Sequence, residues 1–251
     1  MENFFKKGLA WKKSDVDYLI GKVPSFCDYS TLGYLTNDLT LKYEHILQEL
    51  PVNFHIWNNI GIFLDECSDS STNRHSIDNA IAFIKKHDSD CISNTIRLVR
   101  SLHILKNNDK DTDISFSDPA IPLSIFVSMP SSNSKFHIER LVENIIHESL
   151  HLQLTLIEKQ ENIYRENKEK IYSPWKNEPR SNVGILHAVY VFSKLKYFWC
   201  KVENDCQTEF SKSRVETITN ELEKINRDDI IYFYTERGNH LLNCCLKSVY
   251  E

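Results

Sequence analysis

Hydrophobic positions along most of the chain repeat with the period of an α-helix. Three segments space their apolar residues as one face of a helix does, and the first places them at i, i+3, i+4 and i+7. A serine before the first segment and a serine–glutamate capping box at the second would start those helices. The pattern therefore predicts a mainly helical chain. The segments are residues 76–87 with Ser76 as the cap, residues 213–225 with Ser213 and Glu216, and residues 238–250. The predicted apolar stripes are Ile77, Ala80, Ile81 and Ile84 in the first and Val215, Ile218, Leu222 and Ile225 in the second.

Two longer segments are apolar on nearly every face, which is typical of buried helices. The first covers residues 136–160 and the second covers residues 183–199. Between them, residues 171–182 (IYSPWKNEPRSN) are rich in turn residues, and Pro174 and Pro179 restrict the backbone. We therefore expect a rigid loop between two buried helices.

Strand patterns are few. Residues 113–118 (DISFSD) and 122–130 (PLSIFVSMP) alternate apolar and polar positions, as a strand does. The two segments could pair as a short ribbon that precedes the helix of residues 136–160. Six glycines and seven prolines are too few for a sandwich with many tight turns. The sequence therefore predicts an α+β, mainly α-helical fold.

The length of 251 residues fits a single domain, residues 1–251. Within it we expect a helical N-terminal part, residues 1–105, and a core, residues 110–251, that carries a metal site. Polar segments at residues 67–76 and 107–118 look like loops, and both are too short to be linkers between domains.

Composition and charge exclude several classes of partner. The net charge is −5, so no basic excess points to nucleic acid. No segment approaches the ~20 apolar residues of a membrane span, and the N-terminal residues lack the apolar run of a signal peptide. The seven cysteines include no CxxC pair, which speaks against a disulfide framework. We therefore expect a cytoplasmic protein without a membrane partner, and its oligomeric state is left open.

Residues 144–154 (NIIHESLHLQL) contain an HExxH motif, in which Glu148 stands between His147 and His151. On a helix this spacing puts both histidines on one face, one turn apart. Burying two imidazoles without partners is unfavourable, and a shared metal ion would supply the partner. A third histidine six residues further on, as some zinc peptidases have, is missing because Ile157 stands there.

His187 is the better candidate for a third ligand, because it stands in the first turns of the second apolar helix. A later glutamate is the alternative, although the candidates lie in polar surroundings, where a solvated charge is expected. Arg180, between the two helices, could hold a carboxylate with its planar, two-pronged guanidinium, or it could be an ordinary surface arginine. The glutamate candidates are Glu158, Glu161 and Glu203.

The strings IIHESLH, YSPWKNEPR and GILHAVYVF resemble the HExxH-type peptide β-hydroxylases, which are iron(II)- and 2-oxoglutarate-dependent enzymes that modify ribosomally made peptides. The resemblance covers roughly residues 110–200 and extends loosely to the C-terminal string TERGNHLL. It implies Fe(II), 2-oxoglutarate and O₂ as cofactor and co-substrates, and a precursor peptide as the partner. By this resemblance His147, His151 and His187 would be the iron ligands, and Arg180, with Ser173 and Trp175, would bind 2-oxoglutarate.

The sequence thus predicts an oxygenase that hydroxylates a β-carbon of a residue in a precursor peptide. A zinc-dependent HExxH metallopeptidase is the alternative, and a non-catalytic peptide-binding scaffold with structural histidines is a third. Glu148 separates the two enzyme classes. In a peptidase it would be the general base that activates zinc-bound water, whereas in a hydroxylase it would orient a ligand or the substrate.

Overall fold

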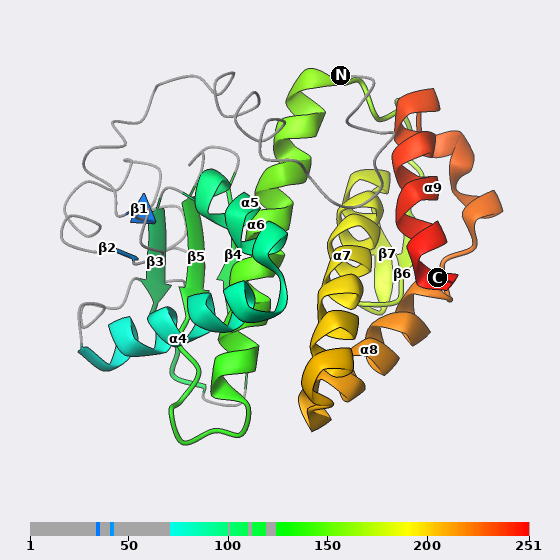
Figure 1. Ribbon diagram of the computed structural model, residues 1–251. Helices are drawn as coiled ribbons and strands as arrows, with labels where there is room; N and C mark the ends of the chain where they lie inside the picture. The colour runs from blue at the N-terminus through cyan, green and yellow to red at the C-terminus, as the bar shows by residue number, and fades with distance from the viewer. Residues whose placement is uncertain are drawn as a thin grey trace. The chain divides into compact units, whose positions relative to one another are not determined.

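The computed structural model describes residues 34–35, 41–42, 71–99, 101–109, 112–118 and 124–250, and the following description is confined to them. Their contacts divide them into two compact units (Figure 1). The first unit ends at Leu152 and the second begins at Gln153, so that helix α6 (His137–Gln160) contributes residues to both. The prediction of a single domain is therefore not confirmed, and each unit is described by itself.

Two helices form the longest N-terminal elements in the described part of the first unit. Helices α4 (Ser71–His87) and α5 (Ser89–Leu98) pack against each other. Because α4 begins at Ser71, the predicted cap Ser76 lies inside the helix, and the end of the predicted loop at residues 67–76 is helical. Asp88 caps α5, and its carboxylate accepts hydrogen bonds from two backbone N–H groups of the first turn. The predicted apolar stripe of α4 is confirmed as buried; it consists of Ile77, Ala80, Ile81 and Ile84.

A three-stranded sheet follows, with β5 (Ser124–Ser128) in the middle. Strand β5 pairs antiparallel with β4 (Ser115–Phe116), which is the ribbon that the sequence predicted. On its other side β5 pairs parallel with β3 (Ser101–Leu105), a strand in the part of the chain that we expected to be helical. A further short pair joins β1 (Tyr34–Leu35) and β2 (Leu41–Lys42).

Three stacked rings connect the strands of this sheet. The ring of Phe126 on β5 lies 4.6 Å from that of His103 on β3 and 4.5 Å from that of Phe116 on β4, between ring centroids. His103 is fully buried, and burial lowers the pKa of its imidazole to about 3. The ring therefore stays neutral, and His103 is a core residue.

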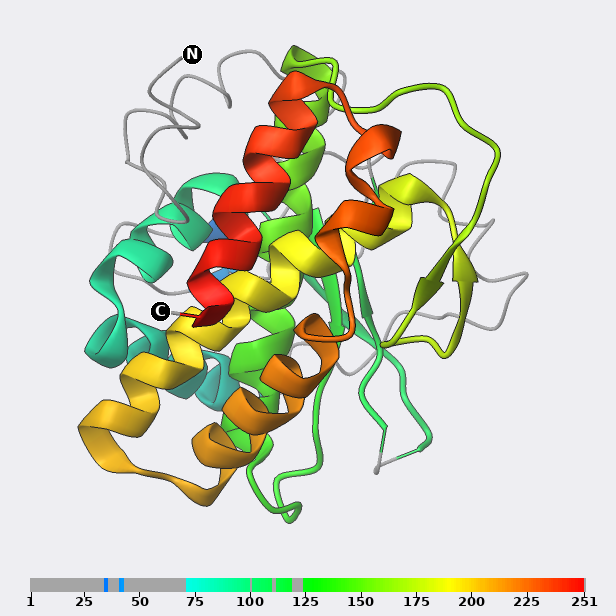
Figure 2. The ribbon, with the colours of Figure 1, turned by 90° about the vertical axis from the view of Figure 1, so that its right-hand side faces the viewer.

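The second unit is built on helices α7 (Asn182–Cys206), α8 (Glu209–Leu222) and α9 (Glu236–Tyr250), with α7 in contact with both others (Figure 2). The buried side chains of α7 confirm the predicted apolar helix at residues 183–199. Thr208 caps α8 by accepting the backbone N–H of Ser211 at 3.0 Å. The predicted capping box is wrong, because Ser213 and Glu216 lie inside the helix. Of the predicted stripe, Ile218, Leu222 and Ile225 are buried and Val215 is partly exposed.

Residues 171–180, which we expected to form part of a loop, are a β-hairpin. Strands β6 (Ile171–Ser173) and β7 (Glu178–Arg180) pair antiparallel, and the hairpin packs against α7. Asn177 turns the chain with a φ of 52°, a left-handed conformation that asparagine tolerates better than most residues. Two short 3₁₀ helices, η2 (Arg227–Asp229) and η3 (Ile231–Phe233), connect α8 to α9.

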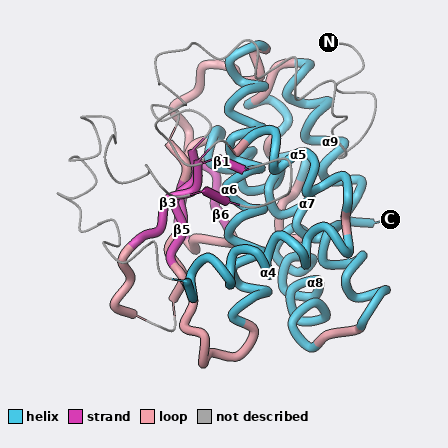
Figure 3. Tube along the Cα trace, turned by 60° about the vertical axis from the view of Figure 1, so that its left-hand side comes forward, coloured by secondary structure: helices cyan, strands magenta, loops and turns pink. Residues whose placement is uncertain are grey.

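Helices dominate the described chain and the strands are short (Figure 3), so that the predicted α+β, mainly α-helical class is confirmed. Helix α6 begins next to its predicted start, and its apolar residues are buried as predicted. In the described ranges no helix is both long and apolar enough to cross a membrane. The buried residues of α6 include Leu141, Ile145, Leu150, Leu152, Leu154 and Ile157.

Candidate functional site

The two histidines of the HExxH motif face each other on α6. The Nε2 atoms of His147 and His151 lie 3.1 Å apart, and both side chains are partly exposed. Metal–nitrogen bonds of ~2.0–2.1 Å from both rings would then meet at about 100°, between the octahedral and tetrahedral values. The same separation also suits a hydrogen bond from one neutral ring to the other. The pair therefore fits two ligands of one metal ion, and it also fits a structural contact.

Glu148, between the two histidines, is only 2% exposed. Its Oε1 atom accepts a hydrogen bond of 2.7 Å from the hydroxyl of Ser115 on β4. Burial raises the pKa of the Glu148 carboxyl to about 7, although hydrogen bonds from Ser115 and Ser117 act in the opposite direction. Both the neutral and the ionised carboxyl are therefore populated near neutral pH.

The next residue of the motif ties α6 to α5. The hydroxyl of Ser149 donates to the carbonyl of Ile146 at 2.8 Å and lies 3.4 Å from the hydroxyl of Thr95 on α5. The contact of Ser149 with Thr95 and that of Glu148 with Ser115 fix the HExxH turn against α5 and β4. The side chains of Glu148 and Ser149 point away from the two imidazoles.

His187 has a carboxylate partner in the second unit. Its Nε2 atom lies 2.7 Å from Oε1 of Glu158, and the hydroxyl of Tyr164 donates to the same oxygen. The side chains of His187 and Glu158 are 18% and 21% exposed. Burial and the charge of Glu158 raise the pKa of Tyr164, which therefore keeps its proton and remains a donor. The expectation that Glu158 is a solvated charge is wrong.

Backbone hydrogen bonds from the segment before α9 fix the chain around Tyr164. The N–H of Thr235 donates to the carbonyl of Ile163 at 2.9 Å, and the N–H of Arg165 donates to the carbonyl of Phe233 at 3.0 Å. A Cβ atom on Gly238 would stand 2.3 Å from the carbonyl oxygen of Ile163, far inside contact distance. This close approach explains the glycine of the TERGNHLL string, because a larger residue would push the two segments apart.

The β6–β7 hairpin carries the three predicted 2-oxoglutarate residues. Ser173 is buried. Trp175 stacks on Phe192 of α7, with ring centroids 5.1 Å apart, and its indole N–H is buried with no hydrogen-bond partner in the described part of the chain. Arg180 is 48% exposed and forms an ion pair with Glu178, its neighbour on the same strand. The hairpin thus offers two buried donors, the Ser173 hydroxyl and the Trp175 N–H, and one exposed cation.

The predicted site residues divide between the two units. His147, Glu148 and His151 belong to the first unit, whereas His187 and the hairpin residues belong to the second. Among the described residues, no group of three or more His, Cys, Asp or Glu side chains is arranged to hold a metal ion.

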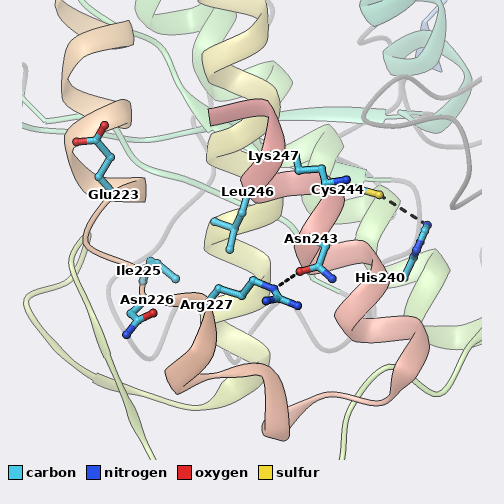
Figure 4. A pocket seen from close by; sticks show the side chains of 9 residues that line it. All are labelled: Glu223, Ile225, Asn226, Arg227, His240, Asn243, Cys244, Leu246 and Lys247. Carbon is cyan, nitrogen blue, oxygen red and sulfur yellow. Dashed lines mark hydrogen bonds between the residues drawn. The ribbon is translucent and has the colours of Figure 1, made fainter. Parts of the chain in front are cut away.

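A separate cavity of about 720 Å³ lies in the second unit (Figure 4). Its walls are the turn after α8 and one face of α9, and Arg227 spans it by donating to Asn243. On α9 the Sγ atom of Cys244 lies 3.7 Å from Nε2 of His240. None of the predicted site residues lines this cavity, whose lining is Glu223, Ile225, Asn226, Arg227, His240, Asn243, Cys244, Leu246 and Lys247.

Glu158 was expected to be a solvated charge, and Tyr164 was not among the predicted site residues. The signal for Glu158 was its spacing, because it follows His151 by seven residues, which is two turns of one helical face. No comparable signal exists for Tyr164, which stands outside any regular element. Its role depends on chain segments that meet only in the folded protein.

Compared with protein-family models and with curated protein sequences, the chain shows no significant match. The resemblance to the HExxH-type peptide β-hydroxylases thus rests on the quoted sequence strings alone, and the activity that it implies stays a prediction.

Proposed function

We propose that this protein is an iron(II)- and 2-oxoglutarate-dependent oxygenase that hydroxylates a β-carbon in a ribosomally made precursor peptide. The observation that carries the proposal is the pair of imidazoles on α6. The Nε2 atoms of His147 and His151 lie 3.1 Å apart, which suits two ligands of one metal ion. Non-haem iron oxygenases use a small set of such ligands and keep other positions open. Such an enzyme would act in the cytoplasm, where precursor peptides are made.

His187 is the third ligand in this proposal. It belongs to the other unit, so its approach to the HExxH pair is itself part of the proposal. Its contact with Glu158 supports the role, because metal-binding histidines usually donate their other ring N–H to a carboxylate, a carbonyl or water. When bound, the iron with 2-oxoglutarate and O₂ would supply the oxidising power that converts C–H to C–OH, with succinate and CO₂ as co-products.

The β6–β7 hairpin would bind 2-oxoglutarate. Arg180 would exchange its partner Glu178 for the distal carboxylate, which a guanidinium can hold through two parallel hydrogen bonds. Trp175 supports this assignment, because its buried N–H has no partner among the described residues and an oxygen of the ligand would provide one. The hydroxyl of Ser173 is a further buried donor on the same hairpin.

A zinc-dependent peptidase is the second candidate, and one observation favours it. The pKa of Glu148, raised to about 7 by burial, suits a general base near neutral pH. In the oxygenase, Glu148 instead holds α6 against β4 through the hydroxyl of Ser115, and its charge takes no part in the reaction. The two candidates therefore differ in what Glu148 does.

The experiment that tests the proposal compares two metal-loaded forms of the purified protein. The Fe(II) form, prepared without oxygen, is given 2-oxoglutarate, then a candidate precursor peptide chosen from the short open reading frames next to its gene, and finally O₂. We expect succinate together with a peptide whose intact mass has increased by one oxygen atom. His147→Ala should give neither product, whereas His75→Ala, which removes an exposed histidine of α4, should behave like the wild type.

Two other outcomes would decide against the oxygenase. Shortening of the peptide by the Zn(II) form, without any need for 2-oxoglutarate, would identify the peptidase, and Glu148→Gln should then abolish the cleavage. A wild type that binds neither metal would leave only the non-catalytic peptide-binding scaffold with structural histidines.

A further inference from the structure

Beyond the ligand set, we propose that Glu158 and Tyr164 are positioning residues that fix the imidazole of His187 for metal binding. This inference rests on the proposed function, since it takes His187 as a ligand. It concerns only residues of the second unit, whose contacts with one another are known.

The contacts form a chain of donors and acceptors. Oε1 of Glu158 meets both the Nε2 atom of His187, at 2.7 Å, and the hydroxyl of Tyr164. A carboxylate only accepts hydrogen bonds, so Nε2 of the imidazole must carry the proton. The nitrogen that would bind a metal is then Nδ1, whose basicity the neighbouring carboxylate raises.

The hydroxyl of Tyr164 holds the Glu158 carboxylate in the conformation that meets His187. A glutamate side chain has several rotatable bonds and, when partly exposed, seldom holds one conformation by itself. Here the phenol fixes the oxygen that meets the imidazole. The phenol is fixed in turn, because the backbone of Tyr164 pairs with that of Tyr234 and the neighbouring carbonyl of Ile163 accepts the N–H of Thr235.

The other end of the chain is anchored to the same segment. The hydroxyl of Tyr234 donates to the backbone carbonyl of Asn182 at 2.9 Å, and the side-chain amide of Asn182 donates to the carbonyl of Phe233 at 3.3 Å. Asn182 begins α7, the helix that carries His187. The segment before α9 therefore fixes both Tyr164, which donates to Glu158, and the start of α7, which carries His187. Residues that position the His187 side chain must be held in this way relative to its helix.

The test uses three variants and two measurements. Glu158→Ala removes the acceptor, Glu158→Gln keeps an acceptor without the charge, and Tyr164→Phe removes only the hydroxyl. The first measurement is the NMR signal of the His187 Nε2–H proton in the metal-free protein, which should exchange slowly in the wild type and be lost in Glu158→Ala. The second is titration with Co(II), whose visible absorption reports its ligands.

Loss of a hydrogen-bond partner to a metal-binding histidine typically weakens metal binding about 10–100-fold. We expect a loss in this range for Glu158→Ala, a partial rescue in Glu158→Gln, and a smaller loss in Tyr164→Phe. Glu161→Ala is the matched control, because it removes a carboxylate three residues further along the chain. It should leave both the proton signal and the Co(II) affinity unchanged.

The two possible failures are distinguishable. If the wild type binds Co(II) and Glu158→Ala binds it equally well, the positioning role is wrong while the ligand set stands. If the wild type does not bind Co(II), the proposed function fails. A slowly exchanging Nε2–H signal that survives in Glu158→Ala would also contradict the positioning role, whatever metal is bound.

Discussion

The two glutamates of α6 that lie near candidate histidines have opposite surroundings. Glu148 is 2% exposed, and its partners are the neutral hydroxyls of serines. Glu158 is 21% exposed and meets an imidazole and a phenol. Burial without a cation raises the pKa of Glu148 to about 7, because the charged form loses its water and gains no counter-charge. The comparison shows that the partner, and not the place on the helix, decides what a carboxylate can do.

The histidines differ in the same way. His147 and His151 stand one turn apart on one helix, so their Nε2 separation of 3.1 Å follows from local geometry. His187 depends on Glu158, which is 29 residues away in the chain. The HExxH region is thus set locally, whereas the His187 region is assembled from distant segments, and changes in the two regions should have different consequences.

The largest expected effect tests whether the three histidines act together. His147→Ala, His151→Ala and His187→Ala should each lower metal affinity by more than about 100-fold, the upper range for residues that only support a ligand. Metal content, measured by elemental analysis after dialysis, checks this, with circular dichroism to show that each variant is folded. Full metal occupancy in His187→Ala would remove it from the ligand set and reopen the search for a glutamate ligand.

The next prediction concerns Glu148 in the metal-free protein. Its pKa is raised from 4.5 to about 7 in the folded state. The folded protein therefore holds a proton that the unfolded chain loses, and stability should fall as pH rises from about 4.5 to about 7. A shift of this size corresponds to about 3 kcal/mol. Urea denaturation at several pH values should show this loss in the wild type, and a much weaker pH dependence in Glu148→Gln.

Ser115→Ala sharpens the same prediction. The hydroxyl of Ser115 acts against the rise in the pKa of Glu148, so its removal should extend the loss of stability to higher pH. Identical pH profiles for the wild type and Glu148→Gln would mean that another group titrates in this range.

The assembled region should be sensitive at Gly238. Gly238→Ala places a Cβ atom 2.3 Å from the carbonyl oxygen of Ile163, and such overpacking against the backbone typically destabilises by about 1–3 kcal/mol. Gly184→Ala is the matched control, since its Cβ atom would meet neighbours only at 3.7 Å, and alanine favours a helix by up to about 1 kcal/mol. In thermal denaturation, the melting temperatures of Gly238→Ala and Gly184→Ala should shift in opposite directions or by clearly unequal amounts. Equal shifts would mean that the two segments separate easily.

The smallest effect is expected at Arg180, because its side chain is 48% exposed. Solvent weakens an exposed charge pair, so Arg180→Ala should raise the 2-oxoglutarate concentration for half-maximal succinate formation only about tenfold, or ~1.4 kcal/mol. Arg180→Lys should restore part of the affinity, since it keeps the charge without the two-pronged donor. Iron content should be unchanged in both. An unaltered titration would assign the co-substrate carboxylate to another cation, such as Lys176 or Arg237.

Local patterns were sufficient for much of the fold. Helical periodicity predicted α4, α8 and α9, and segments that are apolar on nearly every face predicted α6 and α7. Alternation predicted the pairing of β4 with β5. Helix starts were less predictable: Ser76 and Ser213 lie inside helices that begin earlier, at Ser71 and after Thr208. A cap depends on one hydrogen bond, and several serines and threonines near a helix start can make it.

The sequence by itself determined the HExxH pair, because i and i+4 on a helix bring two imidazoles together wherever the helix lies. Only the tertiary structure decided the surroundings of His187. Strand β3 pairs with β5, which follows it after a long intervening segment. Glu158 meets His187, 29 residues further along the chain, and Ile163 meets the distant Thr235 and Gly238. The physical reason is that side-chain spacing within one element is set by its backbone geometry, whereas contacts between elements depend on how the whole unit packs.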